Sequence, residues 1–213
     1  MPGRGKRLLA AATLLLCTAL CHAAPEFAGE RASDDTRYVA SWVLAIADNE
    51  GRPFAIVDKR DARIYVFEPD GQLIGASAAL LGTDLGDLSV PDIAHRTPAS
   101  LAAGERTTAA GRFASEPGHN DKGEDIVWVD YDASVAIHRL RPAPPHERRA
   151  ERLDSSTTAD KRISLGCIVV PVTFYESVVR PSLGRRRGVV YVLPESRPVQ
   201  AMFGTVEVSL RAR

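Results

Sequence analysis

A thiol and an imidazole in this sequence could act together as a nucleophile and its base. Cys167 follows Ser164-Leu165-Gly166 within an apolar run over residues 163–170. A free thiol is mostly protonated at neutral pH, so a working cysteine needs a base nearby. Of the five histidines, His138 is the one that falls on a predicted strand, over residues 134–140. A strand neighbour could meet it there, and the pair would perform acyl transfer through a thioester.

Other side chains near this pair could support such chemistry. Gly166 lets the backbone approach closely, so its amide and that of Cys167 could face a carbonyl oxygen bound at the sulfur. Ser164 is either a supporting group or a strand residue bonded to the backbone. Arg162 and Arg139 could meet a substrate carboxylate, and the alternative is a solvated charge. The histidines and the cysteine show no metal-ligand spacing, so we expect no metal and no cofactor.

Short apolar segments with turn signals between them predict a mostly β fold of mixed and antiparallel strands. Two hairpins stand out because β-branched and aromatic residues flank short turns. Pro171 precedes residues with helical spacing, so one helix is expected over 171–179. The expected strands are 54–58, 63–67, 72–80, 125–131, 134–140, 163–170, 188–193 and 205–210.

The remaining segments are less regular. Residues 82–110 hold Gly, Asp, Pro and Thr with little periodicity, so they form either a lid over the site or a disordered loop. Residues 142–161 combine prolines with a charged block, which suits a short exposed helix. Residues 42–47 could be a strand or a short helix, and residues 24–40 look like a flexible leader.

The first 23 residues resemble a secretory signal peptide. Arg4, Lys6 and Arg7 precede an apolar run of about 13 residues, and small residues follow it. The run is too short to span a bilayer. The alternative is an uncleaved membrane anchor. Cleavage removes three basic and no acidic residues from a chain of balanced charge, which leaves a net charge of −3. Without a dense basic face, a nucleic-acid partner is not expected.

Cleavage would also leave Cys167 as the sole cysteine in about 190 residues, enough for one domain with its own core. A single cysteine cannot form an internal disulfide. In an exported protein this thiol is therefore either buried and inert or reactive and used.

The motifs together resemble the catalytic domain of the L,D-transpeptidases. Ala136-Ile137-His138, then Ser164-Leu165-Gly166-Cys167-Ile168, are similar to that family's His and Ser-x-Gly-Cys elements, and residues 105–113 are similar to its Thr-Pro-x-Gly-x-Phe strand entry. The resemblance covers residues 53–194 and implies a β-sandwich catalytic domain, which we place at residues 41–213. It also implies Cys167 as nucleophile, His138 as base, and no cofactor.

The resemblance implies a function at the bacterial cell wall. The expected substrates are peptidoglycan stem peptides, with release of D-Ala and formation of 3-3 cross-links, or carboxypeptidase activity when water is the acceptor. Carbapenems acylate members of this family. The expected location is the periplasm or cell envelope.

Several departures from the family pattern leave an alternative open. Leu165 and Val169 stand where members usually carry polar or aromatic groups, and Arg139 replaces a common glycine. The separation of 29 residues between His138 and Cys167 indicates an insertion over residues 142–161. The alternative is a degenerate member that binds peptidoglycan as a structural envelope protein.

Overall fold

The computed structural model describes residues 24–90, 93, 96 and 100–205. The expected signal peptide, and residues 206–210 of the last expected strand, lie outside these residues. The fold is mostly β, as the sequence predicts. Its strands are β1 (Phe54–Asp58), β2 (Arg63–Phe67), β3 (Leu73–Ala78), β4 (Leu81–Gly82), β5 (Gly111–His119), β6 (Asp125–Asp130), β7 (Val135–Arg139), β8 (Arg162–Ser164), β9 (Ile168–Val170) and β10 (Gly188–Val192).

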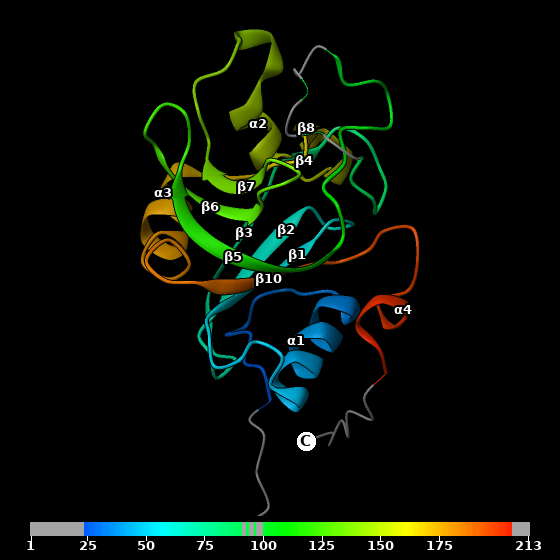
Figure 1. The fold of residues 1–213 in the computed structure, drawn as a ribbon, viewed down its shortest axis with the longest axis vertical. Helices are drawn as coiled ribbons and strands as arrows, with labels where there is room; N and C mark the ends of the chain where they lie inside the picture. The colour runs from blue at the N-terminus through cyan, green and yellow to red at the C-terminus, as the bar shows by residue number, and fades with distance from the viewer. Residues whose placement is uncertain (1–23, 91–92, 94–95, 97–99, 206–213) are drawn as a thin grey trace, which may run out of the picture.

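Eight strands form one mixed sheet in the order β3-β2-β1-β10-β5-β6-β7-β9 (Figure 1). Both expected hairpins are present: β1 pairs antiparallel with β2, and β6 with β7. The two parallel neighbours in this sheet are β1 with β10 and β7 with β9. The short strands β4 and β8 form a separate parallel pair. The expected strand 163–170 is therefore two strands, because Gly166 interrupts it with a φ of +136°.

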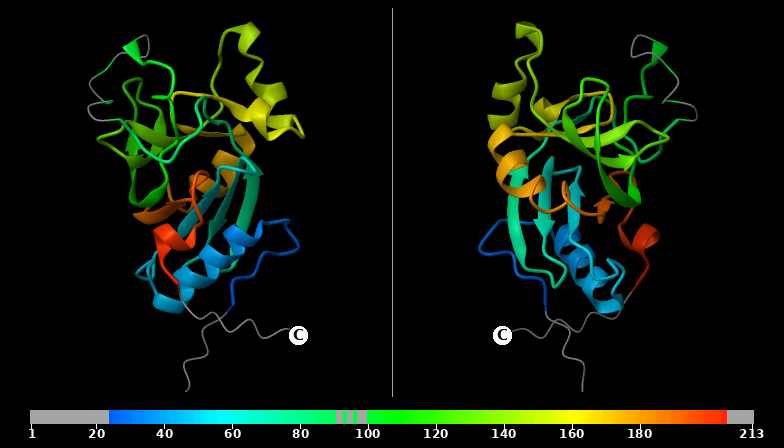
Figure 2. Two further views of the ribbon diagram at one scale, coloured as in Figure 1. Left: turned by 90° about the vertical axis from the view of Figure 1, so that its right-hand side faces the viewer. Right: turned by 60° about the vertical axis from the view of Figure 1, so that its left-hand side comes forward.

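The long sheet bends, so that β1–β3 and β5–β7 lie in different layers (Figure 2). One apolar core fills the space between the layers and includes Val57 and Ile64 from the first hairpin and Val127, Ile137 and Ile168 from the other half. A second core lies on the opposite face of β1, β2 and β10. Two apolar faces on one sheet explain why β1 and β10 are buried along their whole length.

Helix α1 (Asp34–Ile46) covers the second core, together with α4 (Gln200–Phe203), at one end of the molecule. The flexible leader expected over residues 24–40 is therefore wrong. Phe27 is buried against the aromatic rings of β2, and the Ser33 side chain caps the helix by accepting from the Thr36 N–H. The first turn of α1 carries Asp34 and Asp35, and acidic side chains at this end stabilise a helix.

The other helices are short. Helix α2 (Arg149–Asp154) lies in the expected insertion, at the end of the molecule opposite α1, with 3₁₀ turns η3 (Pro145–Glu147) and η4 (Thr158–Lys161) on either side. The expected helix 171–179 is α3 (Val172–Phe174) followed by the π-helical turn η5 (Tyr175–Val179).

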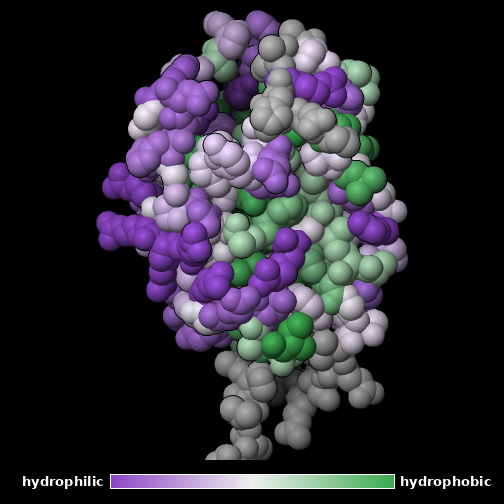
Figure 3. Space-filling view, in the orientation of Figure 1, coloured by the Kyte–Doolittle hydropathy of each residue, from purple (hydrophilic) through white to green (hydrophobic). Residues whose placement is uncertain are grey.

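The described helices offer no transmembrane segment, since each is too short or too polar to cross a bilayer. The surface is unevenly polar: in Figure 3, polar side chains gather along the left of the face and apolar ones in its middle and right.

Candidate active site

His138 lies on β7, at the centre of the site expected from the sequence. Its Nδ1 donates to the Arg139 carbonyl oxygen at 2.8 Å, which fixes the neutral tautomer with its lone pair on Nε2. The side chain is 8% exposed. Burial lowers the pKa of His138 from 6.5 to about 4, and the nearby Arg141 and Arg149 act in the same direction. The imidazole is therefore an uncharged base at neutral pH.

Cys167 directly precedes β9, the parallel neighbour of β7. His138 is paired with Val169 in this ladder, and Cys167 is two residues before Val169. Because side chains in extended backbone alternate between faces, the thiol and the imidazole lie on the same side of the sheet. The thiol donates to the Ser134 carbonyl oxygen at 3.5 Å. Burial raises the pKa of the Cys167 thiol, although the Ala136 N–H favours the thiolate.

His138 and Cys167 line one cavity of about 280 Å³, which we call the thiol cavity. The sequence left open whether these two residues lie near each other, and the structure places both in the lining of this cavity. One wall comes from the inserted segment, with Pro142, Pro144 and Arg149. Leu165, 40% exposed, also lines the cavity. The insertion therefore borders the thiol, a role that its prolines and charges did not reveal.

Ser164 holds the backbone around Cys167. Its hydroxyl donates to the Cys167 carbonyl oxygen at 2.6 Å and accepts from the Gly166 N–H at 3.1 Å. Gly166 is required for its φ of +136°, and a Cβ there would lie 2.8 Å from the Thr107 carbonyl oxygen. The Gly166 amide is thus already bonded, so the expected pair of oxyanion donors reduces to the Cys167 amide in this conformation.

Arg162 and Arg139 lie away from the thiol cavity. Arg162 donates to Glu195 at 2.5 Å and to the Lys59 carbonyl oxygen at 2.8 Å. Arg139 pairs with Asp125, and with Glu176 at 2.8 Å. Its guanidinium also lies 4.7 Å from the centre of the Tyr175 ring. Both arginines are therefore occupied by acidic partners, and neither lines the cavity that holds Cys167.

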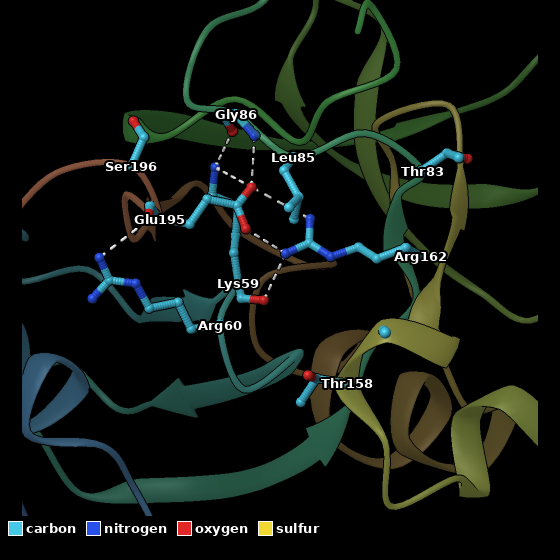
Figure 4. A pocket seen from close by; sticks show the side chains of 10 residues that line it. Lys59, Arg60, Thr83, Leu85, Gly86, Thr158, Arg162, Glu195 and Ser196 are labelled. Atoms are coloured by element: carbon cyan, nitrogen blue, oxygen red, sulfur yellow. Dashed lines mark hydrogen bonds and ion pairs between the residues drawn. The ribbon is translucent and has the colours of Figure 1, made fainter. Parts of the chain in front are cut away.

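A larger cavity of about 780 Å³ lies elsewhere, and we call it the lysine cavity (Figure 4). Lys59 and Arg162 line it with Glu195 and Ser196. The Lys59 side chain is fully buried, and its amine contacts Asp87 Oδ1 at 2.9 Å. No sequence pattern indicates this cluster, because Lys59 falls in a hairpin turn where lysine is normally solvated.

No cluster of histidine, cysteine and acidic side chains suited to a metal ion occurs in the described residues. The expectation of a metal-independent site stays a prediction.

Comparison with known proteins gives structural matches only. No protein-family model and no curated protein sequence matches the chain. An L,D-transpeptidase from Mycobacterium smegmatis is 16% identical, with 66% of this chain and 58% of that chain covered and a TM-score of 0.37. An L,D-transpeptidase from Xylanimonas cellulosilytica is 16% identical, with 67% and 60% covered and a TM-score of 0.38.

The helical cell shape determining protein Pgp2 from Campylobacter jejuni is also similar, at 16% identity, 74% and 55% coverage and a TM-score of 0.43. This chain spans about half to three-fifths of the length of these solved chains. Because the TM-scores are below 0.5, these matches carry no argument about activity. They include the L,D-transpeptidases, the family that the sequence resembles.

Proposed function

We propose that this chain is a cysteine acyltransferase of the L,D-transpeptidase type, with Cys167 as nucleophile and His138 as base. The observation that carries the proposal is the shared cavity, which is lined by a buried neutral imidazole and by Cys167, a residue of intermediate exposure. The Arg139 carbonyl holds the imidazole so that Nε2 is the basic nitrogen. A base, a nucleophile and an orienting group are the parts that such catalysis needs.

The chemistry begins from a neutral pair. Burial raises the thiol pKa and lowers the imidazole pKa, so proton transfer to His138 accompanies attack. The sulfur forms a bond to the carbonyl carbon of the third stem residue, and the resulting oxyanion accepts from the Cys167 N–H. Protonated His138 returns its proton to the D-Ala amine as the C–N bond breaks. The thioester is then attacked by an amine of a second stem, which gives a 3-3 cross-link, or by water.

The wider setting of the proposal is the cell envelope. The substrate would be peptidoglycan, reached after export directed by residues 1–23, and the catalytic domain would extend over residues 41–213 together with α1. Arg141 and Arg149 line the thiol cavity and act on both reactive groups, but Arg141 pairs with Glu124 at 2.8 Å and Arg149 pairs with Glu147, which lines the same cavity.

A degenerate envelope protein is the second candidate, favoured by one specific observation. The thiol hydrogen bond goes to the Ser134 carbonyl, an arrangement that stabilises the unreactive thiol form. Leu165 and Val169 add apolar surface beside it. Such a protein would bind peptidoglycan without acylation.

Intact-mass spectrometry after incubation with a carbapenem separates the two candidates. The proposal predicts one covalent adduct on the wild-type chain and none on Cys167→Ala. Binding to peptidoglycan sacculi with no adduct on the folded wild-type chain would instead support the degenerate candidate.

A further inference from the structure

The side chain of Thr108 contacts the residue that precedes Cys167. It is fully buried, and its hydroxyl makes two hydrogen bonds to backbone from different parts of the chain. It accepts from the Gly82 N–H at 2.9 Å and donates to the Gly166 carbonyl oxygen at 2.9 Å. Since the hydroxyl proton is committed to Gly166, the direction of this carbonyl is fixed.

The Gly166 carbonyl and the Cys167 N–H belong to the same peptide group. A trans peptide is planar, and its C=O and N–H point in opposite directions. The described residues contain no cis peptide bond. A hydrogen bond that fixes the Gly166 oxygen on the buried side therefore also fixes the Cys167 N–H toward the opposite side. Ser164 holds the same loop through the Cys167 carbonyl and the Gly166 N–H.

The backbone of Thr108 is bonded to Lys59, a buried residue of the lysine cavity. The Lys59 amine donates to the Thr108 carbonyl oxygen at 2.9 Å and to the Gly86 carbonyl oxygen at 2.5 Å. It also lies 2.9 Å from Asp87 and 3.5 Å from Glu195. Figure 4 shows the amine directed to Gly86, with Arg162 reaching the Lys59 carbonyl. The segment that carries Thr108 is thus fixed on both its side-chain and its backbone sides.

We infer that Thr108 is a positioning residue, which orients the Gly166–Cys167 peptide so that the Cys167 N–H donates to the oxyanion formed at the sulfur. The inference rests on the proposed function and adds to it a residue outside the thiol cavity. Lys59 supports this orientation indirectly, because its amine donates to the Thr108 carbonyl oxygen.

The test compares Thr108→Val, which replaces the hydroxyl by a methyl group, with Thr108→Ser, which keeps it. Two rates are measured on each full-length chain: acylation by a carbapenem, which forms an oxyanion, and alkylation by iodoacetamide, which does not. Thr108→Val is expected to acylate about 10- to 100-fold more slowly, since losing an oxyanion donor outright costs about 100- to 1,000-fold. Its alkylation rate should stay within about 2-fold, and Thr108→Ser should acylate within about 3-fold of wild type.

Thr107→Val is the matched control, because the Thr107 hydroxyl donates to the Leu88 carbonyl and not to the nucleophile loop. It should acylate like wild type. Equal acylation by Thr108→Val and wild type overturns the inference, and so does a parallel loss of both rates, which would mean general disruption. Thr108→Ala replaces Thr108→Val if the latter does not fold. A wild-type chain that alkylates but never acylates removes the proposed function itself, a result distinct from either of these.

Discussion

The thiol cavity and the lysine cavity differ in whether their titratable side chains are paired with groups of opposite charge. At the lysine cavity, the lining residues Lys59, Arg162 and Glu195, together with the neighbouring Asp87, neutralise one another in short contacts. Burial alone would raise the pKa of Asp87, but hydrogen bonds from Ser196, the Glu195 amide and Lys59 hold it well below its usual range. In the thiol cavity, His138 and Cys167 are both displaced from their charged forms, and His138 Nε2 keeps a free lone pair by its tautomer.

This difference shows that the larger cavity is not the better candidate for chemistry. A cluster whose charges compensate each other stabilises the chain around it, whereas a nucleophile and base with unused bonding capacity can react. The lysine cluster joins the first hairpin, the 82–110 loop, β8 and the segment after β10, so its main consequence is structural. The predictions below test this division between reaction and support.

The largest expected effect is on the thiol cavity. His138→Ala should slow carbapenem acylation at pH 7 by about 100- to 10,000-fold, because the thiol loses its base. Stopped-flow or mass-spectrometric acylation rates measure this. His119→Ala is the matched control, since His119 is exposed on β5 and does not line this cavity. Equal rates for the two variants would show that His138 is not the base.

Substitutions in the lysine cavity should instead change the stability of the chain. Lys59→Met leaves Asp87 buried without its cation, and breaking a buried ion pair costs about 3–5 kcal/mol. Urea unfolding monitored by circular dichroism gives the free energy of unfolding. Cys167→Ala, by comparison, should change this free energy by about 1 kcal/mol or less. A destabilisation by Lys59→Met no larger than that would contradict a supporting role for the cluster.

Acid should weaken the fold in two stages. The folded pKa of His138, about 4, is below its ordinary 6.5, so the unfolded chain binds more protons between these values. The stability from His138 is complete above pH 6.5 and is lost as the pH falls toward 4, by at most about 3 kcal/mol. Asp87 adds a further loss below its ordinary value of 3.8. Unfolding free energies at pH 7.5 and 4.5 measure the first stage, and the difference between them should be smaller in His138→Gln. If that difference is unchanged in His138→Gln, the loss of stability does not come from His138.

The smallest effect is expected at the rim of the lysine cavity. Arg60 pairs with Asp35 at 2.9 Å, but its side chain is 49% exposed, so solvent screens the pair. Arg60→Ala should change the free energy of unfolding by about 1 kcal/mol or less. A loss as large as that of Lys59→Met would contradict the expectation that an exposed ion pair contributes less to stability than a buried one.

The sequence predicted the elements whose patterns are local. The two hairpins follow from alternating residues around short turns, and His138 and Cys167 could be chosen because one histidine and one cysteine fell on predicted strands. The first part of helix α1 was missed because its apolar residues meet a core only through tertiary contacts, whereas residues 42–47 were expected to be a strand or a short helix. Ser33 followed by Asp34 and Asp35 was a usable helix-start signal.

The lysine cluster and the wall of the thiol cavity depend on contacts between distant segments. Lys59 and Asp87 are 28 positions apart, and single-sequence patterns cannot indicate that a turn lysine is buried. Likewise, the prolines of residues 142–145 read as an exposed insertion, although they border the thiol. The expected boundary at residue 41 falls inside α1, whose residues Val39 and Ala40 belong to the second core. The role of the 82–110 loop as a lid stays a prediction.

The most direct test of the proposed catalytic pair uses the proposed class of substrate, peptidoglycan stem peptides. Purified disaccharide-tetrapeptide is incubated with the wild-type chain, Cys167→Ala and His138→Ala, and free D-Ala and dimeric products are quantified. The account predicts D-Ala release by the wild type, none by Cys167→Ala, and release by His138→Ala that is at least about 100-fold slower. Release that persists in Cys167→Ala, or a folded wild-type chain that releases none with either water or an amine as acceptor, would contradict it.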